Sequence, residues 1–155
     1  MQKEIISHLA SHDPVMKQVS EEVGWPEMTS TQNVFHDLTS CIIEQQIHYR
    51  SSKNTFAKLL AKASLKILTP DNFEVLEEKA LDDIKLSMKK YETLAEVVDF
   101  FLGHSPDWAN MSDAEVREVL GTVPGVGQWT VDMILLYTLE RPDIFPAQDY
   151  HLRLV

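Results

Sequence analysis

The sequence is poor in the residues that build metal centres and covalent cross-links. It has one cysteine among 155 residues, which excludes an intrachain disulfide and a four-cysteine iron–sulfur cluster. Its six histidines do not have the spacing of zinc ligands, so no transition metal is predicted. No apolar run of membrane length and no signal peptide is evident. These absences predict an intracellular globular protein that does not contact a membrane.

Basic residues are also scarce. The chain has 14 lysines and arginines against 24 acidic residues, and its formal net charge of −10 argues against a polyanionic partner. The segment 45–70 is an exception, because it carries basic residues and no Asp or Glu. Its three lysines recur at every fourth residue and would share one helix face, which either contacts phosphates or only meets solvent. The basic residues of this segment are Arg50, Lys53, Lys58, Lys62 and Lys66.

Apolar residues recur at helical spacing, and alternating strand patterns are nearly absent. Hydrophobic residues make up 44% of the chain, which is enough for one sizeable core. We therefore predict an all-α fold, in which Cys41 is a small core residue. The clearest helical patterns are Val34, Leu38 and Ile42; Phe56, Leu59, Leu60 and Ala63; and Leu94, Val97, Val98, Phe101 and Leu102.

Two glycines, Gly125 and Gly127, lie in a short turn between two helical patterns. The first pattern covers 113–120 and has Ser112 as its candidate cap; the second covers 130–139 and stops before a proline. Glycines at this spacing let the backbone come close to another molecule. The free N–H groups of the turn and of the second helix can hold a phosphate oxygen without regard to base sequence.

This turn and the segment that follows it resemble a known signature. Residues 123–130, VPGVGQWT, and 143–149, DIFPAQD, are similar to the L-P-G-V-G-P-W-T-A and D-V-F-P-x-x-D segments of alkylated-base DNA glycosylases. Residues 12–16, 42–52 and 86–95 resemble three further landmarks of that family, in the same order. The chain is identified as similar to the helix-hairpin-helix (HhH-GPD) superfamily, and specifically to 3-methyladenine DNA glycosylase II.

The resemblance implies a single HhH-GPD glycosylase domain that apparently lacks its C-terminal helices. Its parts would be N-terminal helices in 1–32, a helical barrel in 33–110, the helix-hairpin-helix in 112–139, and a catalytic-Asp loop with the start of the next helix in 140–155. It implies a monomer that acts on damaged double-stranded DNA, in the cytoplasm or nucleoid of a prokaryote or the nucleus of a eukaryote. No cofactor is expected, although the hairpin type permits a monovalent cation.

Cleavage of an N-glycosidic bond develops positive charge on the sugar, so the site needs a fixed anion. The resemblance assigns this role to Asp149, which could otherwise only cap a helix that starts at Tyr150. Relatives that also cut the strand place a lysine where this chain has Trp129, so the expected product is an intact strand with an abasic site. The Trp129 ring would stack on a flipped, cationic base, or else serve helix packing alone.

Other site residues follow from the same resemblance. Gln46 is the candidate wedge that fills the gap left by the flipped base, although it could equally be solvated. Glu44 and Lys85 stand where the family usually has glycine, and Glu44 would lie close to a DNA backbone that repels it. The candidate pocket walls are Tyr49, Met133 and Tyr150, each of which could instead be a core residue. The candidate DNA-binding residues are Gln45, Gln46, Ile47, Arg50, Lys53, Gly125, Val126, Gly127 and Thr130.

The leading hypothesis is a monofunctional glycosylase for alkylated purines of the 3-methyladenine type. The acidic composition keeps open a helix-hairpin-helix module that binds DNA or protein without chemistry. A glycosylase for deaminated or oxidised bases also remains open, because pocket composition does not identify the lesion.

Overall fold

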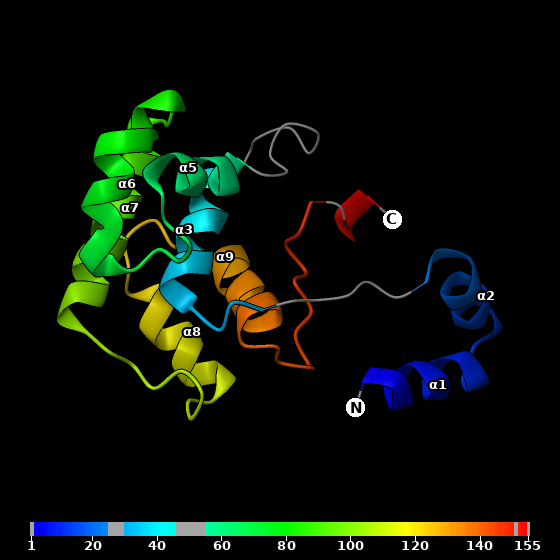
Figure 1. Cartoon of the computed structure of the whole chain (residues 1–155). Helices are drawn as coiled ribbons and strands as arrows, with labels where there is room; N and C mark the ends of the chain where they lie inside the picture. The colour runs from blue at the N-terminus through cyan, green and yellow to red at the C-terminus, as the bar shows by residue number, and fades with distance from the viewer. Residues whose placement is uncertain (1, 25–29, 46–54, 151, 155) are drawn as a thin grey trace.

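The computed structural model describes residues 2–24, 30–45, 55–150 and 152–154, and in these residues it is helical with no strand (Figure 1). The predicted all-α class is therefore confirmed. The α-helices are α1 (Gln2–His12), α2 (Pro14–Val23), α3 (Val34–Glu44), α5 (Thr55–Ala63), α6 (Phe73–Ala80), α7 (Met88–Gly103), α8 (Asp113–Gly121) and α9 (Gln128–Met133). Short helical turns are η1 (Pro70–Asn72), η2 (Leu81–Asp83), η3 (Ile134–Thr138) and η4 (Leu152–Leu154). None of the helices in the described part is long and apolar enough to span a bilayer.

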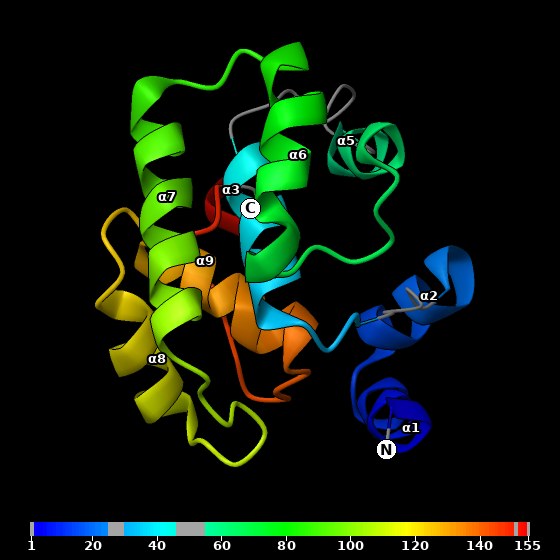
Figure 2. The ribbon, with the colours of Figure 1, turned by 60° about the vertical axis from the view of Figure 1, so that its left-hand side comes forward.

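Helix α3 forms the centre of the main body. Its N-cap Asn33 accepts a hydrogen bond from the His36 backbone N–H, which satisfies one of the free donors at the helix start. Leu38 and Ile43 are completely buried because α3 packs against α5, α7 and the α9–η3 segment. Figures 1 and 2 show these elements around α3 from two directions. One core therefore supports all the elements of the main body.

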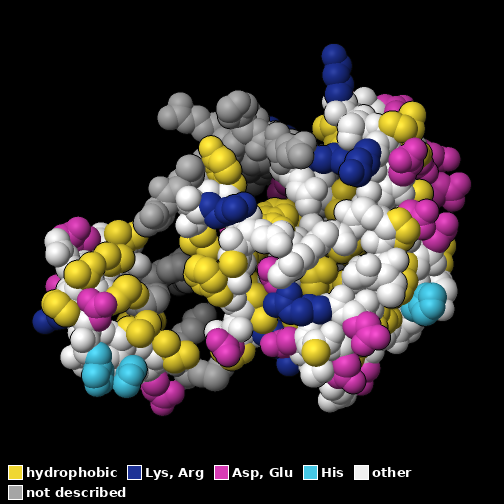
Figure 3. Space-filling model, turned by 180° about the vertical axis from the view of Figure 1, so that it is seen from behind, with side chains coloured by type: hydrophobic (Ala, Val, Ile, Leu, Met, Phe, Trp, Pro, Cys, Tyr) yellow, Lys and Arg dark blue, Asp and Glu magenta, His cyan; other side chains and the backbone are white. Residues whose placement is uncertain are grey.

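Helices α1 and α2 form a separate hairpin. Asp13 caps α2, its carboxylate accepting from the backbone N–H groups of Val15 and Met16, and Pro14 fits the first helical position because that position needs no N–H. Both ribbon views show the pair standing apart from the main body (Figures 1 and 2). Hydrophobic side chains accordingly lie exposed on this hairpin (Figure 3), among them Ile5, Val15, Val19 and Val23.

The predicted helix–turn–helix is present as α8, a Gly turn and α9. Ser112 and Glu115 form a reciprocal capping box at the start of α8. The buried carboxylate of Asp132 on α9 pairs with the Arg117 guanidinium on α8, which fixes the angle between the two helices. Because Asp132 is only 2% exposed, removing its arginine would leave an unpaired buried charge.

The second helix departs from its predicted form. It begins at Gln128 and changes at Ile134 into a π-helical turn, η3, which ends at Thr138 rather than continuing to Leu139. Thr138 is held from outside the helix, since its hydroxyl donates to Asp37 at 2.8 Å and its carbonyl accepts from Ser30 at 2.6 Å. A wider turn at this place moves side chains relative to an α-helix, and such turns are frequent at functional sites.

The prediction that three lysines share one helix face is wrong. Helix α5 ends at Ala63, and Ser64 takes a left-handed backbone conformation with φ of 60°, so the helix cannot continue. Lys66 therefore lies beyond the helix that carries Lys58 and Lys62. Lys62 is also paired, its Nζ lying 2.6 Å from Asp83. Acidic side chains meanwhile gather at the edge formed by α6, α7 and α8, on the right of Figure 3.

Candidate active site

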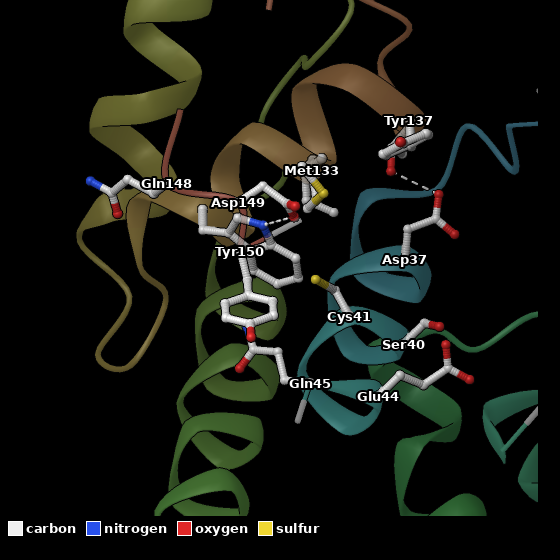
Figure 4. A pocket seen from close by; sticks show the side chains of 13 residues that line it. Asp37, Ser40, Cys41, Glu44, Gln45, Met133, Tyr137, Gln148, Asp149 and Tyr150 are labelled. Carbon is white, nitrogen blue, oxygen red and sulfur yellow. Dashed lines mark hydrogen bonds between the residues drawn. The ribbon is translucent and has the colours of Figure 1, made fainter. Parts of the chain in front are cut away.

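A cavity of about 890 Å³ lies between α3, the α9–η3 segment and residues 148–150. Figure 4 shows it from close by, with α3 forming one wall and α9 the facing one. A volume of this size is in the range of ligand sites for small molecules. The lining residues are Asp37, Ser40, Cys41, Glu44, Gln45, Trp129, Met133, Ile134, Tyr137, Thr138, Gln148, Asp149 and Tyr150.

Asp149 and Trp129 meet in this cavity. The indole Nε1–H of Trp129 donates a hydrogen bond to Asp149 Oδ2 at 2.8 Å (Figure 4). An indole N–H is a donor only, so it orients the carboxylate without supplying an acidic proton. The other carboxylate oxygen accepts from the backbone N–H of Leu152 at 3.4 Å, at the start of η4. The catalytic and capping interpretations of Asp149 are thus geometrically compatible, with the short helix starting at Leu152 rather than Tyr150.

The other predicted pocket walls are partly in place. Met133 and Trp129 are half-buried and Tyr150 is 69% exposed, and all three line the cavity. Tyr49 lies outside the described residues. The cavity therefore offers aromatic rings beside a carboxylate, the combination that attracts a flat cation.

Gln45 and Thr130 contact each other through their side chains. The Gln45 side-chain amide donates to the Thr130 hydroxyl at 2.8 Å, and Thr130 is 2% exposed. The DNA contact predicted for Thr130 was argued from the backbone N–H groups at the start of the second helix, and it stays a prediction. Gln45 is half-buried and forms part of the cavity wall.

The two glycines of the turn have different environments. Gly125 has φ of 85°, and a Cβ built on it would lie 2.1 Å from the Thr93 hydroxyl oxygen on α7. Gly127 has nothing within 4 Å of such a Cβ and is exposed at the start of α9. Gly125 therefore serves turn formation and packing, whereas Gly127 leaves its backbone open to a close approach. Between them the Val126 side chain is buried at 8% exposure, so only its backbone could contact a ligand.

The α3 wall is the part of the site that the sequence interpretation missed. Asp37, Ser40, Cys41 and Glu44 follow the spacing i, i+3, i+4, i+7, which places them on one helix face. Cys41 is half-buried against the cavity and is not the core residue that we predicted. The polar residues that recur at this spacing along 37–44 were the available signal.

Glu44 has a local structural role. Its Oε1 accepts a hydrogen bond from the Phe56 backbone N–H at 3.1 Å, in the first turn of α5. A carboxylate at a helix N-terminus is stabilised by the helix dipole. Glu44 therefore joins α3 to α5, which gives a reason for a glutamate at a place where glycine was expected.

Several predicted site residues fall in a segment that the structure does not describe. The predicted wedge and its neighbours, Gln46, Ile47, Arg50 and Lys53, lie outside the described residues. Among the residues that the structure does describe, no group of three or more His, Cys, Asp or Glu side chains could hold a metal ion.

The known proteins to which this chain is similar are named as 3-methyladenine DNA glycosylases. No protein-family model matches the chain. It is 24% identical over 154 residues to DNA-3-methyladenine glycosylase 1 of Schizosaccharomyces pombe, covering 94% of this chain and 68% of that protein. It is also 24% identical to the Bacillus subtilis protein YfjP, whose name assigns it the same activity provisionally, covering 96% of this chain and 55% of that one. The chain thus spans between half and about two thirds of these relatives.

The solved structure of the Schizosaccharomyces pombe 3-methyladenine DNA glycosylase Mag1, in complex with abasic DNA, superimposes with a TM-score of 0.79. The match covers 97% of this chain and 77% of that one at 23% identity. This chain has the Mag1 fold. At such identity the likeness establishes the fold, and the chemistry rests on the residues of the cavity.

Proposed function

We propose that this protein is a monofunctional DNA glycosylase that flips alkylated purines out of double-stranded DNA and hydrolyses their N-glycosidic bond. The observation that carries the proposal is the Trp129–Asp149 pair, which places an oriented carboxylate and an aromatic ring in one open cavity. The anion would stabilise the positive charge that develops on the sugar as the bond breaks. The 3-methyladenine glycosylases that share the fold support the same assignment.

The charge of the cavity favours a cationic base. Asp37, Glu44 and Asp149 line it, and no lysine or arginine is among its described lining residues. Alkylation at a ring nitrogen makes a purine cationic, and such a base is attracted both to carboxylates and to the face of an indole ring. This supports alkylated purines as the substrate class over neutral lesions.

The product should be an abasic site in an intact strand. Strand cleavage by a glycosylase requires an amine that attacks the sugar, and Trp129 has none to offer. The turn around Gly127 would hold the DNA backbone, because its exposed backbone is open to close approach.

The test is incubation with duplexes that carry single lesions, scored for breakage with and without a subsequent alkali step. Breakage only after alkali, on N7-methylguanine or 3-methyladenine, is the expected result. Release of hypoxanthine or an oxidised base instead would select the alternative substrate class. Duplex binding without release of any base would select the binding module.

Asp149→Asn is the decisive variant. It keeps an acceptor for the indole and removes the charge, so excision should fall by at least about 100-fold while DNA affinity is retained or increased. Undiminished turnover in this variant would remove Asp149 from the catalytic role.

A further inference from the structure

The first turns of α7 contact both the end of α3 and the hairpin turn between α8 and α9. Lys90 Nζ donates to the carbonyl oxygens of Ile43, at 3.1 Å, and of Gln45, at the end of α3. Thr93, one helical turn further along the same face, is the residue against which Gly125 packs. Helix α7 thus touches the end of α3 and the hairpin turn at once.

The Lys90 contacts supply hydrogen-bond donors to backbone carbonyl oxygens at the end of α3. The last carbonyls of a helix have no partner within it, and a lysine that reaches them also complements the negative end of the helix dipole. Lys90 is half-buried at this place, and burial lowers its pKa, an effect that the nearby Cys41 thiol partly offsets. The ammonium group therefore binds these two carbonyl oxygens rather than solvent.

Gln45 links Lys90 to α9, the wall of the cavity that carries Trp129. Its carbonyl is held by Lys90 while its side-chain amide is held by the Thr130 hydroxyl at 2.8 Å. Thr130 follows Trp129, whose indole binds Asp149. The hydrogen bonds run from α7 through the end of α3 to Thr130 on α9, and the next residue back along that helix, Trp129, binds the carboxylate.

We propose that Lys90 is a positioning residue: by holding the end of α3 and Gln45 against Thr130, it aligns the two walls of the cavity around the target base. It contacts neither base nor sugar and acts through Gln45. The proposal rests on the proposed glycosylase function, and it predicts an effect on the excision step rather than on general DNA affinity. A small misplacement of a catalytic group can slow a reaction by roughly 10- to 100-fold.

The test compares Lys90→Met with Lys89→Met, which removes the same charge from an exposed neighbour on α7. On a duplex with one N7-methylguanine, Lys90→Met should slow single-turnover excision by roughly 10- to 100-fold. Its affinity for undamaged duplex should stay within about twofold, Lys89→Met should match the parent, and Lys90→Arg should restore most of the rate. A Lys90→Met rate equal to that of Lys89→Met would overturn the proposal.

A double variant separates positioning from a general loss of stability. If Lys90 acts through Gln45, then Lys90→Met combined with Gln45→Leu should be no slower than the slower single variant. Additive losses would refute the proposal. If Lys90→Met fails to fold, Gln45→Leu is the test variant, because it keeps the carbonyl contacts to Lys90 and removes the amide bond to Thr130. An unchanged excision rate in Gln45→Leu would also refute the proposal.

The Gln45 side-chain amide gives a measurement that needs no activity. In ¹⁵N spectra its signals should shift in Lys90→Met and remain in place in Lys89→Met. Should the parent protein excise no base, the proposed function fails while this spectrum still decides the positioning role. Unchanged Gln45 amide signals in Lys90→Met would overturn that role whatever the activity.

Discussion

The indole nitrogen of Trp129 lies 2.8 Å from a carboxylate oxygen of Asp149, and the two residues come from separate segments on either side of the η3 turn. Under the proposed function, Trp129 would serve two purposes. Trp129 lines the cavity, where its ring would stack on a base under the proposed function, while its N–H orients the carboxylate that would act on the sugar.

Trp129→Phe separates these two purposes. Phenylalanine keeps an aromatic face and removes the N–H, so base capture should persist while the carboxylate loses its orientation. A hydrogen bond to a charged group contributes about 1.5–3 kcal/mol, which corresponds to a single-turnover rate lower by roughly 10- to 100-fold. Rates measured against lesion concentration would show the loss in kcat. A loss confined to KM would mean that the N–H only assists stacking.

The turn glycines should respond in opposite ways to substitution by alanine. Gly125→Ala meets both a left-handed backbone and the Thr93 hydroxyl, so it should destabilise the fold by more than about 2 kcal/mol in chemical denaturation. Gly127→Ala has open space for its methyl group and should keep the parent's stability. It should nevertheless weaken duplex binding, because the methyl group enters the surface that the DNA backbone approaches. Equal stabilities of the two variants would contradict this distinction.

His36 should make the fold sensitive to acid. Its Nδ1 accepts from the Leu68 backbone N–H at 2.9 Å, and burial lowers its pKa below the usual 6.5, an effect that Asp37 partly offsets. The unfolded chain therefore binds the proton more readily than the folded one. The stability from His36 is complete above about pH 6.5 and is lost as the pH falls through the lowered pKa.

Thermal unfolding at pH 7.5 and pH 5 of the parent and of His36→Asn checks this expectation. Asparagine can supply an acceptor to Leu68 without titrating, so the variant should lose less stability on acidification. His104→Asn, at an exposed position, is the matched control and should behave as the parent does. The same acid sensitivity in all three proteins would exclude His36 as its source.

The Cys41 thiol should be unreactive in the folded protein. Burial, together with the charge of Glu44, raises its pKa to about 12 from an ordinary 9.0. Because the thiolate is the reactive form, alkylation near neutral pH should be roughly 100- to 1000-fold slower than in the unfolded chain. Glu44→Gln keeps an acceptor for Phe56 and removes the negative charge, so it should speed the reaction. Equal rates in folded and unfolded protein would show that the thiol is not shielded.

The local sequence was enough to predict where a helix begins when the capping residues at its start satisfy each other. Ser112 and Glu115 lie three residues apart and satisfy each other's backbone donors, so the start of α8 follows from the sequence alone. The start of α2 at Asp13 and Pro14 has a local cause of the same kind. The end of α5 was not predicted, because the left-handed Ser64 at its terminus leaves no mark on the lysine spacing.

The sequence by itself determined the all-α class and the helix–turn–helix, because these depend on spacing and on residue type along a short segment, and its resemblance to alkylated-base glycosylases singled out Asp149 and Trp129 as candidates. Only the tertiary structure decided that Gly125 packs on Thr93 while Gly127 is open, that Gln45 binds Thr130, and that one face of α3 completes the cavity. Each of these contacts joins residues from elements far apart in the sequence. Their distances are set by how the helices pack around α3, and no local pattern encodes that packing.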